Sequence, residues 1–157
     1  MATYISKNFT LEEFIKSDTA IKYKIDNTPN STQRANIERL VHFLLQPIRD
    51  AFGQYIIIGS GFRSSKLNAK VGGVSNSQHL CNGKSAAADL TLYKKGDTLV
   101  QKRKKNQELF DFIRQMRDKK LIVFDQLIFE KGGKEGPDWV HISYNIDNNR
   151  NQVLKIK

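Results

Sequence analysis

Apolar residues recur at helical spacing in two long segments of the chain. Between residues 31 and 52 they mark one buried face, made of Ile37, Val41, Leu44, Leu45, Ile48 and Phe52. Between residues 98 and 118 a second face is marked by Leu99, Leu109, Phe110, Ile113 and Met116. The spacing predicts two long helices over these ranges. Pro47 lies inside the first and should kink or split it, because proline cannot donate a helical hydrogen bond.

Shorter helices are expected nearer the N-terminus. The stretch TLEE, which begins at Thr10, fits a capping box and predicts a helix over about 10–17. Residues 19–25 are expected to form another helical turn, and IDNTPNST is rich in loop-forming residues. The stretch SSKLNAKVGG predicts a short helix closed by its two glycines.

Strand patterns follow the first long helix. Tyr55–Ile58 is an apolar run that predicts a buried strand, and AAADLTL predicts another over 87–92. Phe124–Glu130 and Asp138–Tyr144 predict a hairpin whose strands are joined by the glycine-rich KGGKEGP. Because helices come first and strands cluster later, we expect an α+β fold with an antiparallel sheet of about four strands and flanking helices.

Length and composition are those of a folded domain. The 157 residues are 39% hydrophobic and 27% charged, so we expect one globular domain over 1–157. No apolar run approaches the ~20 residues that a membrane span needs. Cys81 is the only cysteine, which excludes an intrachain disulfide. The start, MATYISKNFTLEEF, has no apolar signal core, so we expect synthesis in the cytoplasm without a Sec signal.

The charge balance is strongly basic. Lys and Arg total 26 against 16 acidic residues, a formal net charge of +10. Such a charge favours polyanionic partners, among them nucleic acid, an anionic cell wall or a membrane surface. The densest run, QKRKKN, is typical of a solvated helix face. It has no interleaved aromatic residues and no recognisable nucleic-acid motif, so no specific nucleic acid is expected.

Candidate chemistry begins with the histidines, of which there are three. His42 has apolar neighbours on the first long helix and is expected to be a core or boundary residue. His79 begins a small-residue stretch that ends in Asp89, and His141 lies in the strand-like WVHISY. Two imidazoles and one carboxylate with an open position are a ligand set of catalytic zinc. HEXXH and CXXC signals are absent, so these residues alone leave a metal site as one alternative.

The order of the motifs SGFRS, SQH, G, AAD and WVH resembles that of the zinc D-alanyl-D-alanine metallopeptidases. That family includes D,D-carboxypeptidases, vancomycin-resistance dipeptidases and phage L-alanyl-D-glutamate endolysins, and it shares its fold with the hedgehog signalling domain. The likeness covers about residues 8–145, including NFTLEEF and LLQPIRDAFG. It implies a hedgehog-like α+β fold.

The resemblance also implies roles for individual residues. It makes His79, Asp89 and His141 the zinc ligands, and it places Arg63 of SGFRS facing the substrate near the metal. An arginine fork can bind a peptide carboxylate or a polarised carbonyl oxygen. The ten-residue step from His79 to Asp89 is longer than the family's usual spacing, so we expect a bulge or wider loop there. Cys81, within that loop, is expected to be a bystander.

Three acids are candidates for the general base of such a peptidase: Glu130, Glu135 and Asp138. Asp138 precedes His141 by three residues, so in a regular strand it points away, unless the strand starts after it. Wider relatives do use an acid at that offset, and Asp138 stays open. If Glu130 lies opposite Trp139, it shares a face with His141, and this hypothesis favours Glu130. Glu135 is expected in solvent.

The function implied by the resemblance is a zinc peptidase that hydrolyses peptidoglycan stem or cross-link peptides. We expect a monomer that acts at the bacterial wall, either as a phage or prophage endolysin or after non-Sec export. Its positive charge would help it adhere to an anionic wall. One alternative is a non-catalytic wall-binding or phage structural module on the same fold, and another is a nucleic-acid-binding domain. D,D- or L,D-specificity, and endo- or carboxypeptidase action, stay open.

Overall fold

The computed structural model describes residues 1–157. The helices are α1 (Leu11–Ile15), α2 (Asp18–Lys22), α3 (Ser31–Leu40), a π-helical turn (Val41–Leu45), α4 (Gln46–Phe52), α5 (Ser65–Lys70), a 3-10 turn (Gln78–Leu80) and α6 (Leu99–Asp118). The strands are β1 (Ile57–Ser60), β2 (Ser85–Thr91), β3 (Gln126–Glu130), β4 (Trp139–Asn145) and β5 (Gln152–Ile156).

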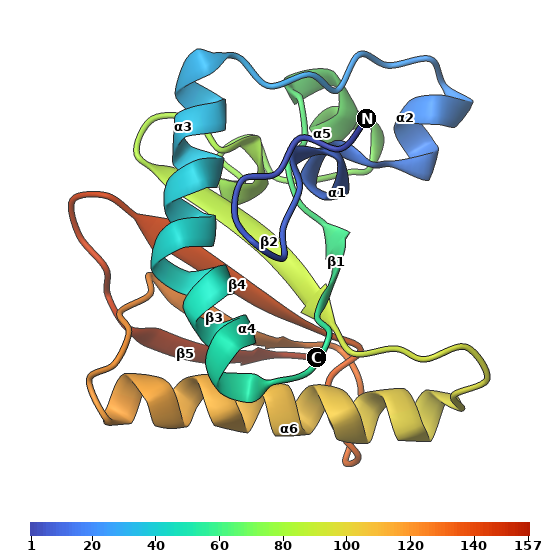
Figure 1. Cartoon of the computed structure of the whole chain (residues 1–157). Coiled ribbons are helices and arrows are strands. Elements are labelled where there is room, and N and C mark those ends of the chain that lie inside the picture. Colours follow the sequence, from blue (N-terminus) through green and yellow to red (C-terminus); the bar gives the residue numbers. More distant parts are fainter.

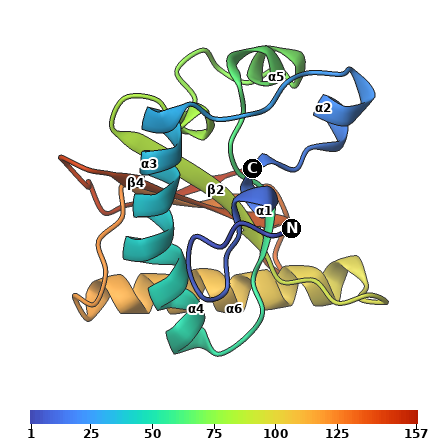
Figure 2. The same ribbon diagram turned by 45° about the horizontal axis from the view of Figure 1, so that its top comes forward.

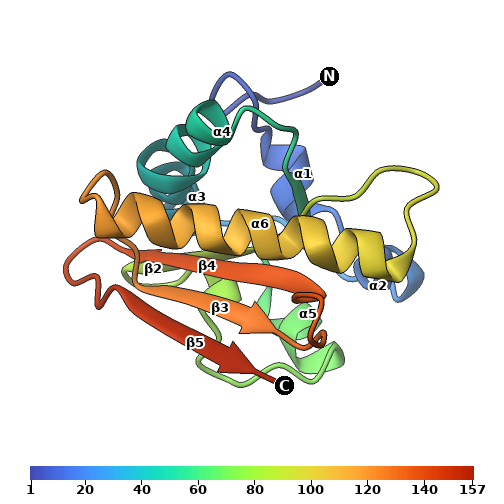
Figure 3. The same ribbon diagram turned by 90° about the horizontal axis from the view of Figure 1, so that it is seen from below.

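The strands form one sheet in the order β1-β2-β4-β3-β5. All neighbours are antiparallel except β3 and β5, which are parallel. The predicted α+β class with flanking helices is confirmed; the sheet has five strands instead of about four, and the added strand β5 is parallel to β3. After β4 the chain turns back and passes the start of β3, so β5 lies on the far side of β3 and runs in the same direction (Figure 3).

The first long helix is divided, as the position of Pro47 suggested. A π-helical turn separates α3 from α4, and Pro47 is the second residue of α4. The three segments follow one another along one rod (Figure 1). Because proline has no N–H to donate, a regular helix cannot continue through this point, and the turn before it widens. Val41 and Leu45 face the core, while His42 is exposed. The expectation that His42 is a core or boundary residue is therefore wrong.

The second long helix agrees with its prediction within one residue. α6 begins after Thr98, which forms a capping box with Gln101, and it lies across the sheet (Figure 3). The α3–α4 rod packs over the neighbouring part of the same face (Figure 2). No helix in the structure combines the length and apolar character needed to cross a membrane.

The shorter elements agree less closely. The capping box at Thr10 is present, with the Thr10 amide 2.8 Å from Glu13 Oε2. The predicted strand Tyr55–Ile58 begins later, as β1, because pairing with β2 starts at Ile57. The predicted strand 87–92 is β2, which begins two residues earlier.

Strand alternation gives the sheet two chemically different faces. Ala88 and Leu90 of β2, Leu127 and Phe129 of β3, and Val140 and Ile142 of β4 join the core under the helices. The intervening side chains point to the opposite face. They include Asp89, Ile128, Glu130, Trp139 and His141, and they line a groove there. One face of the sheet thus packs against the helices in the hydrophobic core, and the other face lines a polar groove.

Candidate metal centre

Asp89 and His141 are opposite each other on neighbouring strands. The antiparallel register of β2 and β4 pairs Asp89 with His141. Directly opposed residues of an antiparallel pair have side chains on the same face. Asp89 Oδ1 lies 3.1 Å from His141 Nδ1. The sheet itself therefore aligns a carboxylate with an imidazole.

His79 approaches the same carboxylate from the 3-10 turn. Its Nε2 lies 3.3 Å from Asp89 Oδ1. Its Nδ1 lies 2.8 Å from the carbonyl oxygen of Gly61, which can only accept a hydrogen bond. The Nδ1 atom therefore carries the proton and donates to Gly61, which leaves the Nε2 lone pair facing Asp89. A backbone carbonyl in this position is a common way to orient a metal-binding histidine.

The extra residues between His79 and Asp89 form a loop that ends before β2. Cys81 (φ 54°) and Gly83 (φ 59°) adopt left-handed conformations that turn the chain back into the sheet. Cys81 is fully buried in the core, and burial raises the pKa of its thiol to about 12. It does not belong to the group of ligand atoms around Asp89. The extra residues therefore widen a loop and leave the three side chains together.

The three side chains fit a metal ion. One ligand atom from each of His79, Asp89 and His141 lies within 4.8 Å of the other two. Ligands of a tetrahedral zinc ion stand about 3.3 Å apart, close to the two separations measured from Asp89 Oδ1. Burial by itself raises the pKa of Asp89, but the two histidines more than offset it and hold the pKa well below its usual range. Asp89 is thus ionised at neutral pH, as a metal-binding carboxylate has to be.

A groove of about 930 Å³ surrounds this group and also exposes Arg63, Glu130 and Trp139. A second cavity of about 550 Å³ adjoins it and shares Arg63, Asp89 and Trp139. Arg63 Nη1 donates to Asn68 Oδ1 at 3.2 Å, while its Nε is buried without a partner. Burial lowers the pKa of Arg63, opposed by the nearby charge of Asp89. The indole Nε1 of Trp139 is likewise buried and unpartnered.

Glu130 lies beside the three candidate ligands. It is paired with Trp139 in the β3–β4 register, which is the arrangement that puts Glu130 on the face of His141. Its carboxylate lines the groove that holds His79, Asp89 and His141. Burial raises the pKa of Glu130, and the negative charge of Asp89 raises it further.

Asp138 is engaged elsewhere. β4 begins at Trp139, after Asp138, so strand alternation does not fix its direction. Its Oδ1 accepts a hydrogen bond of 2.8 Å from Arg103 Nε on α6, and it lines only the adjoining cavity. Glu135 is half-buried, 3.9 Å from Arg103 Nη1, so the expectation that it is solvated is wrong. Of the three candidate bases, Glu130 is the one that lines the groove with the candidate metal ligands.

Several residues around the site were not anticipated from the sequence. Gly61 and Asn68 contact His79 and Arg63, respectively. Gln78 contacts both His141 and Asp125, which lies just before β3. Gln78 adjoins His79 in the chain, which is a weak signal, but its partners are 47 and 63 residues away. No local pattern connects positions so far apart.

Comparison with known proteins agrees with this geometry. No curated protein matches the chain significantly. A family model described as Peptidase M15 matches residues 7–123, which is well over half of the chain. The matched region contains Arg63, His79 and Asp89, and the M15 family is zinc-dependent. The chain therefore belongs to the Peptidase M15 family of zinc metallopeptidases.

Proposed function

We propose that residues 1–157 form a single zinc peptidase domain that hydrolyses peptidoglycan stem or cross-link peptides, with His79, Asp89 and His141 as the metal ligands. The observation that carries the proposal is the convergence of these ligand atoms in a groove that also holds Glu130 and Arg63. A zinc ion held there would polarise the scissile carbonyl and lower the pKa of a bound water.

The protein side chains then have separate tasks. Glu130 accepts a proton from the attacking water and passes it to the leaving amine, which a carboxylate of raised pKa can do in both directions. Arg63 holds the carbonyl oxygen or a terminal carboxylate of the peptide with its planar fork. The groove wall of Trp139 and Ile128 provides apolar contact with the stem peptide.

The location of the activity follows from the substrate. We propose that the protein acts at the bacterial wall as a phage or prophage endolysin, or after non-Sec export. The net charge of +10 favours adhesion to an anionic wall polymer. The competing candidate is a wall-binding module without catalysis, and the presence of a complete ligand set beside Glu130 favours the enzyme.

A digestion experiment separates these functions. Purified sacculi are incubated with the zinc-loaded protein and with His141→Ala, and soluble products are identified by mass spectrometry. Released alanine indicates carboxypeptidase action, and new amino termini within the stem indicate endopeptidase action. Sedimentation with sacculi without any release would overturn the enzymatic proposal and support the binding module.

A further inference from the structure

An ion pair between a half-exposed arginine and a buried aspartate lines the groove just before β3. Arg150 donates from Nε and Nη2 to the two oxygens of Asp125, each at 2.8 Å. The Asp125 side chain is 4% exposed, and the hydrogen bonds from Arg150 lower its pKa. A two-pronged contact of this kind fixes the orientation of the carboxylate. Asp125 is thus an ionised, immobile acceptor.

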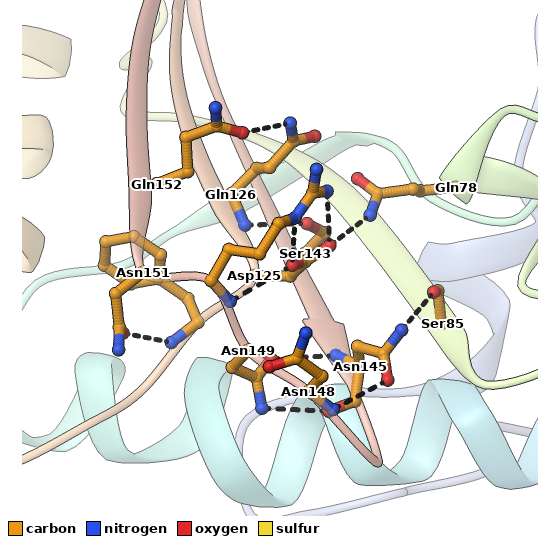
Figure 4. A network of polar contacts seen from close by, with 12 residues as sticks. Gln78, Ser85, Asp125, Gln126, Ser143, Asn145, Asn148, Asn149, Asn151 and Gln152 are labelled. Atoms are coloured by element: carbon orange, nitrogen blue, oxygen red, sulfur yellow. Dashed lines mark hydrogen bonds and ion pairs between the residues drawn. The ribbon is translucent and has the colours of Figure 1, made fainter.

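Gln78 lies between this carboxylate and a candidate metal ligand. Its Nε2 donates to Asp125 Oδ2 at 2.7 Å, and Figure 4 shows its amide turned toward Asp125. Its Oε1 lies 3.4 Å from His141 Nε2. Arg150, Asp125, Gln78 and His141 therefore form one continuous polar chain that ends at the metal centre.

The donors and acceptors in this series of four side chains favour one arrangement of the protons. An ionised carboxylate only accepts hydrogen bonds, so the amide nitrogen of Gln78 must face Asp125. The amide oxygen then faces His141, and it accepts a hydrogen bond from that ring only if Nε2 carries the proton. A neutral imidazole protonated on Nε2 has its lone pair on Nδ1. Nδ1 is the atom that faces Asp89 Oδ1 at 3.1 Å.

We propose that Gln78, held by Asp125 and Arg150, is a positioning residue that orients His141 so that Nδ1 binds the metal and Nε2–H donates to the amide. This inference rests on the metal site of the proposed function. It assigns the two histidines opposite ring atoms, since His79 uses Nε2 and donates from Nδ1 to Gly61. Neighbours of ligating histidines that act in this way typically change metal affinity about 10–100-fold when removed.

The test compares Gln78→Leu with Gln152→Leu. Gln152 also makes a glutamine–glutamine hydrogen bond, of 2.7 Å to Gln126, but it is exposed and does not contact His141. Zinc affinity is measured by competition with a chromophoric chelator. Gln78→Leu is expected to bind zinc about 10–100-fold more weakly, whereas Gln152→Leu binds as wild type does. Circular dichroism verifies that both variants are folded.

A spectroscopic readout needs no variant. Long-range 15N–1H spectra of histidine rings in the zinc-loaded wild type are expected to show Nδ1 coordination with a proton on Nε2 for His141, and the reverse for His79. Coordination of His141 through Nε2 would overturn the inference. The inference would also be overturned if folded Gln78→Leu bound zinc with the affinity of the wild type. If the wild type binds zinc and only these results fail, the metal site stands without the Gln78 role; if it binds none, both proposals fail.

The hydrogen bond between Gln78 and Asp125 is tested by Asp125→Asn. An asparagine has both a donor and an acceptor, so it no longer forces the amide of Gln78 into one orientation. Zinc affinity is expected to fall below that of Gln152→Leu while the metal-free protein stays folded. Affinity equal to that of the wild type would overturn the role of Asp125 in the chain.

Discussion

The main-chain N–H of Arg63 donates to the main-chain oxygen of His79 at 2.8 Å. The loop after β1 and the 3-10 turn are thereby fastened together beside the groove. The next contact along the loop is His79 Nδ1 with Gly61 O, so two bonds connect these segments within three residues. The position of the candidate substrate-binding arginine is coupled to that of a candidate metal ligand.

Loss of either histidine ligand should weaken zinc binding. His79→Ala and His141→Ala each remove one of three protein ligands, so zinc content after dialysis should fall several-fold from about one ion per chain. His42→Gln is the control, because His42 is exposed and lies outside the ligand group. Mass spectrometry of metal content checks this. Stoichiometric zinc in both alanine variants would show that the metal binds elsewhere.

Arg63→Lys should keep the fold and the zinc but lose most peptidase activity. Lysine preserves the charge but cannot reproduce a planar contact through two donors. Peptide release from sacculi and zinc content are measured on the same preparation. Turnover equal to that of the wild type would reduce Arg63 to a structural residue of its loop.

Gly73→Ala should disturb Arg63 indirectly. A Cβ on Gly73 would lie 2.1 Å from Asn68 Oδ1 and 2.9 Å from Arg63 Nη1, so Asn68 must move and its hydrogen bond to Arg63 is lost. We expect reduced activity with zinc retained. Gly72→Ala is not an equivalent control, because Gly72 has a positive φ. Asn68→Ala is the matched variant, and it should reproduce the loss; full activity in both would contradict the contact.

Two amide substitutions distinguish Glu130 from Asp138 as the general base. Glu130→Gln keeps size and polarity but cannot accept a proton, so cleavage should fall about 10²-fold or more with zinc retained. Asp138→Asn should have a much smaller effect on catalysis, because Asp138 is paired with Arg103. Rates of muropeptide release decide between them. The reverse ranking would assign the base to Asp138.

Stability should depend on pH through Asp125. Its folded-state pKa is lowered by Arg150, so the ion pair stabilises the fold above the unfolded pKa of about 3.9, and this contribution is lost as pH falls toward the folded value. In chelator, urea unfolding should show Asp125→Asn less stable than wild type at pH 7. The difference should shrink as the pH falls below the unfolded pKa of about 3.9. A constant difference at pH 7 and below that pKa would exclude the linkage.

The parts of the fold that were predictable are those with a local signal. α6 repeats apolar residues at helical spacing and begins with a capping box at Thr98, so its range was correct within one residue. The hairpin across the glycine-rich loop was also predicted, and the pairing of Glu130 with Trp139, on which the choice of Glu130 depended, is present. β5 has no such signal, because it is a short edge strand whose residues are mostly exposed or half-buried, and lysine interrupts its apolar residues. Its place beside β3 depends on a return path that no local pattern encodes.

The candidate site was predictable only through its motifs. His79, Asp89 and His141 lie in stretches that resemble the family, and the fold brings them together. The partners of Gln78 and Asp138 were not predictable, because each depends on a tertiary contact: Gln78 with Asp125, and Asp138 with Arg103 on α6. His42 was misassigned because neighbours in the sequence need not share a helix face: it lies about 100° around the helix from the buried Val41 and is exposed.

The alternation of side chains across the sheet has a consequence for how such a protein can diverge. Phe129 and Val140 face the helices. Phe129 is followed in the sequence by Glu130, and Val140 lies between Trp139 and His141, all three of which line the groove. Substitutions on the helix side mainly alter how well the chain folds. Changes on the groove side, at positions such as Ile128, alter which peptide is accepted while the packed layer stays the same. Descendants of one ancestor could therefore acquire new substrate preferences by exchanging groove-side residues other than the candidate ligands and base, while the packed layer beneath stays unchanged.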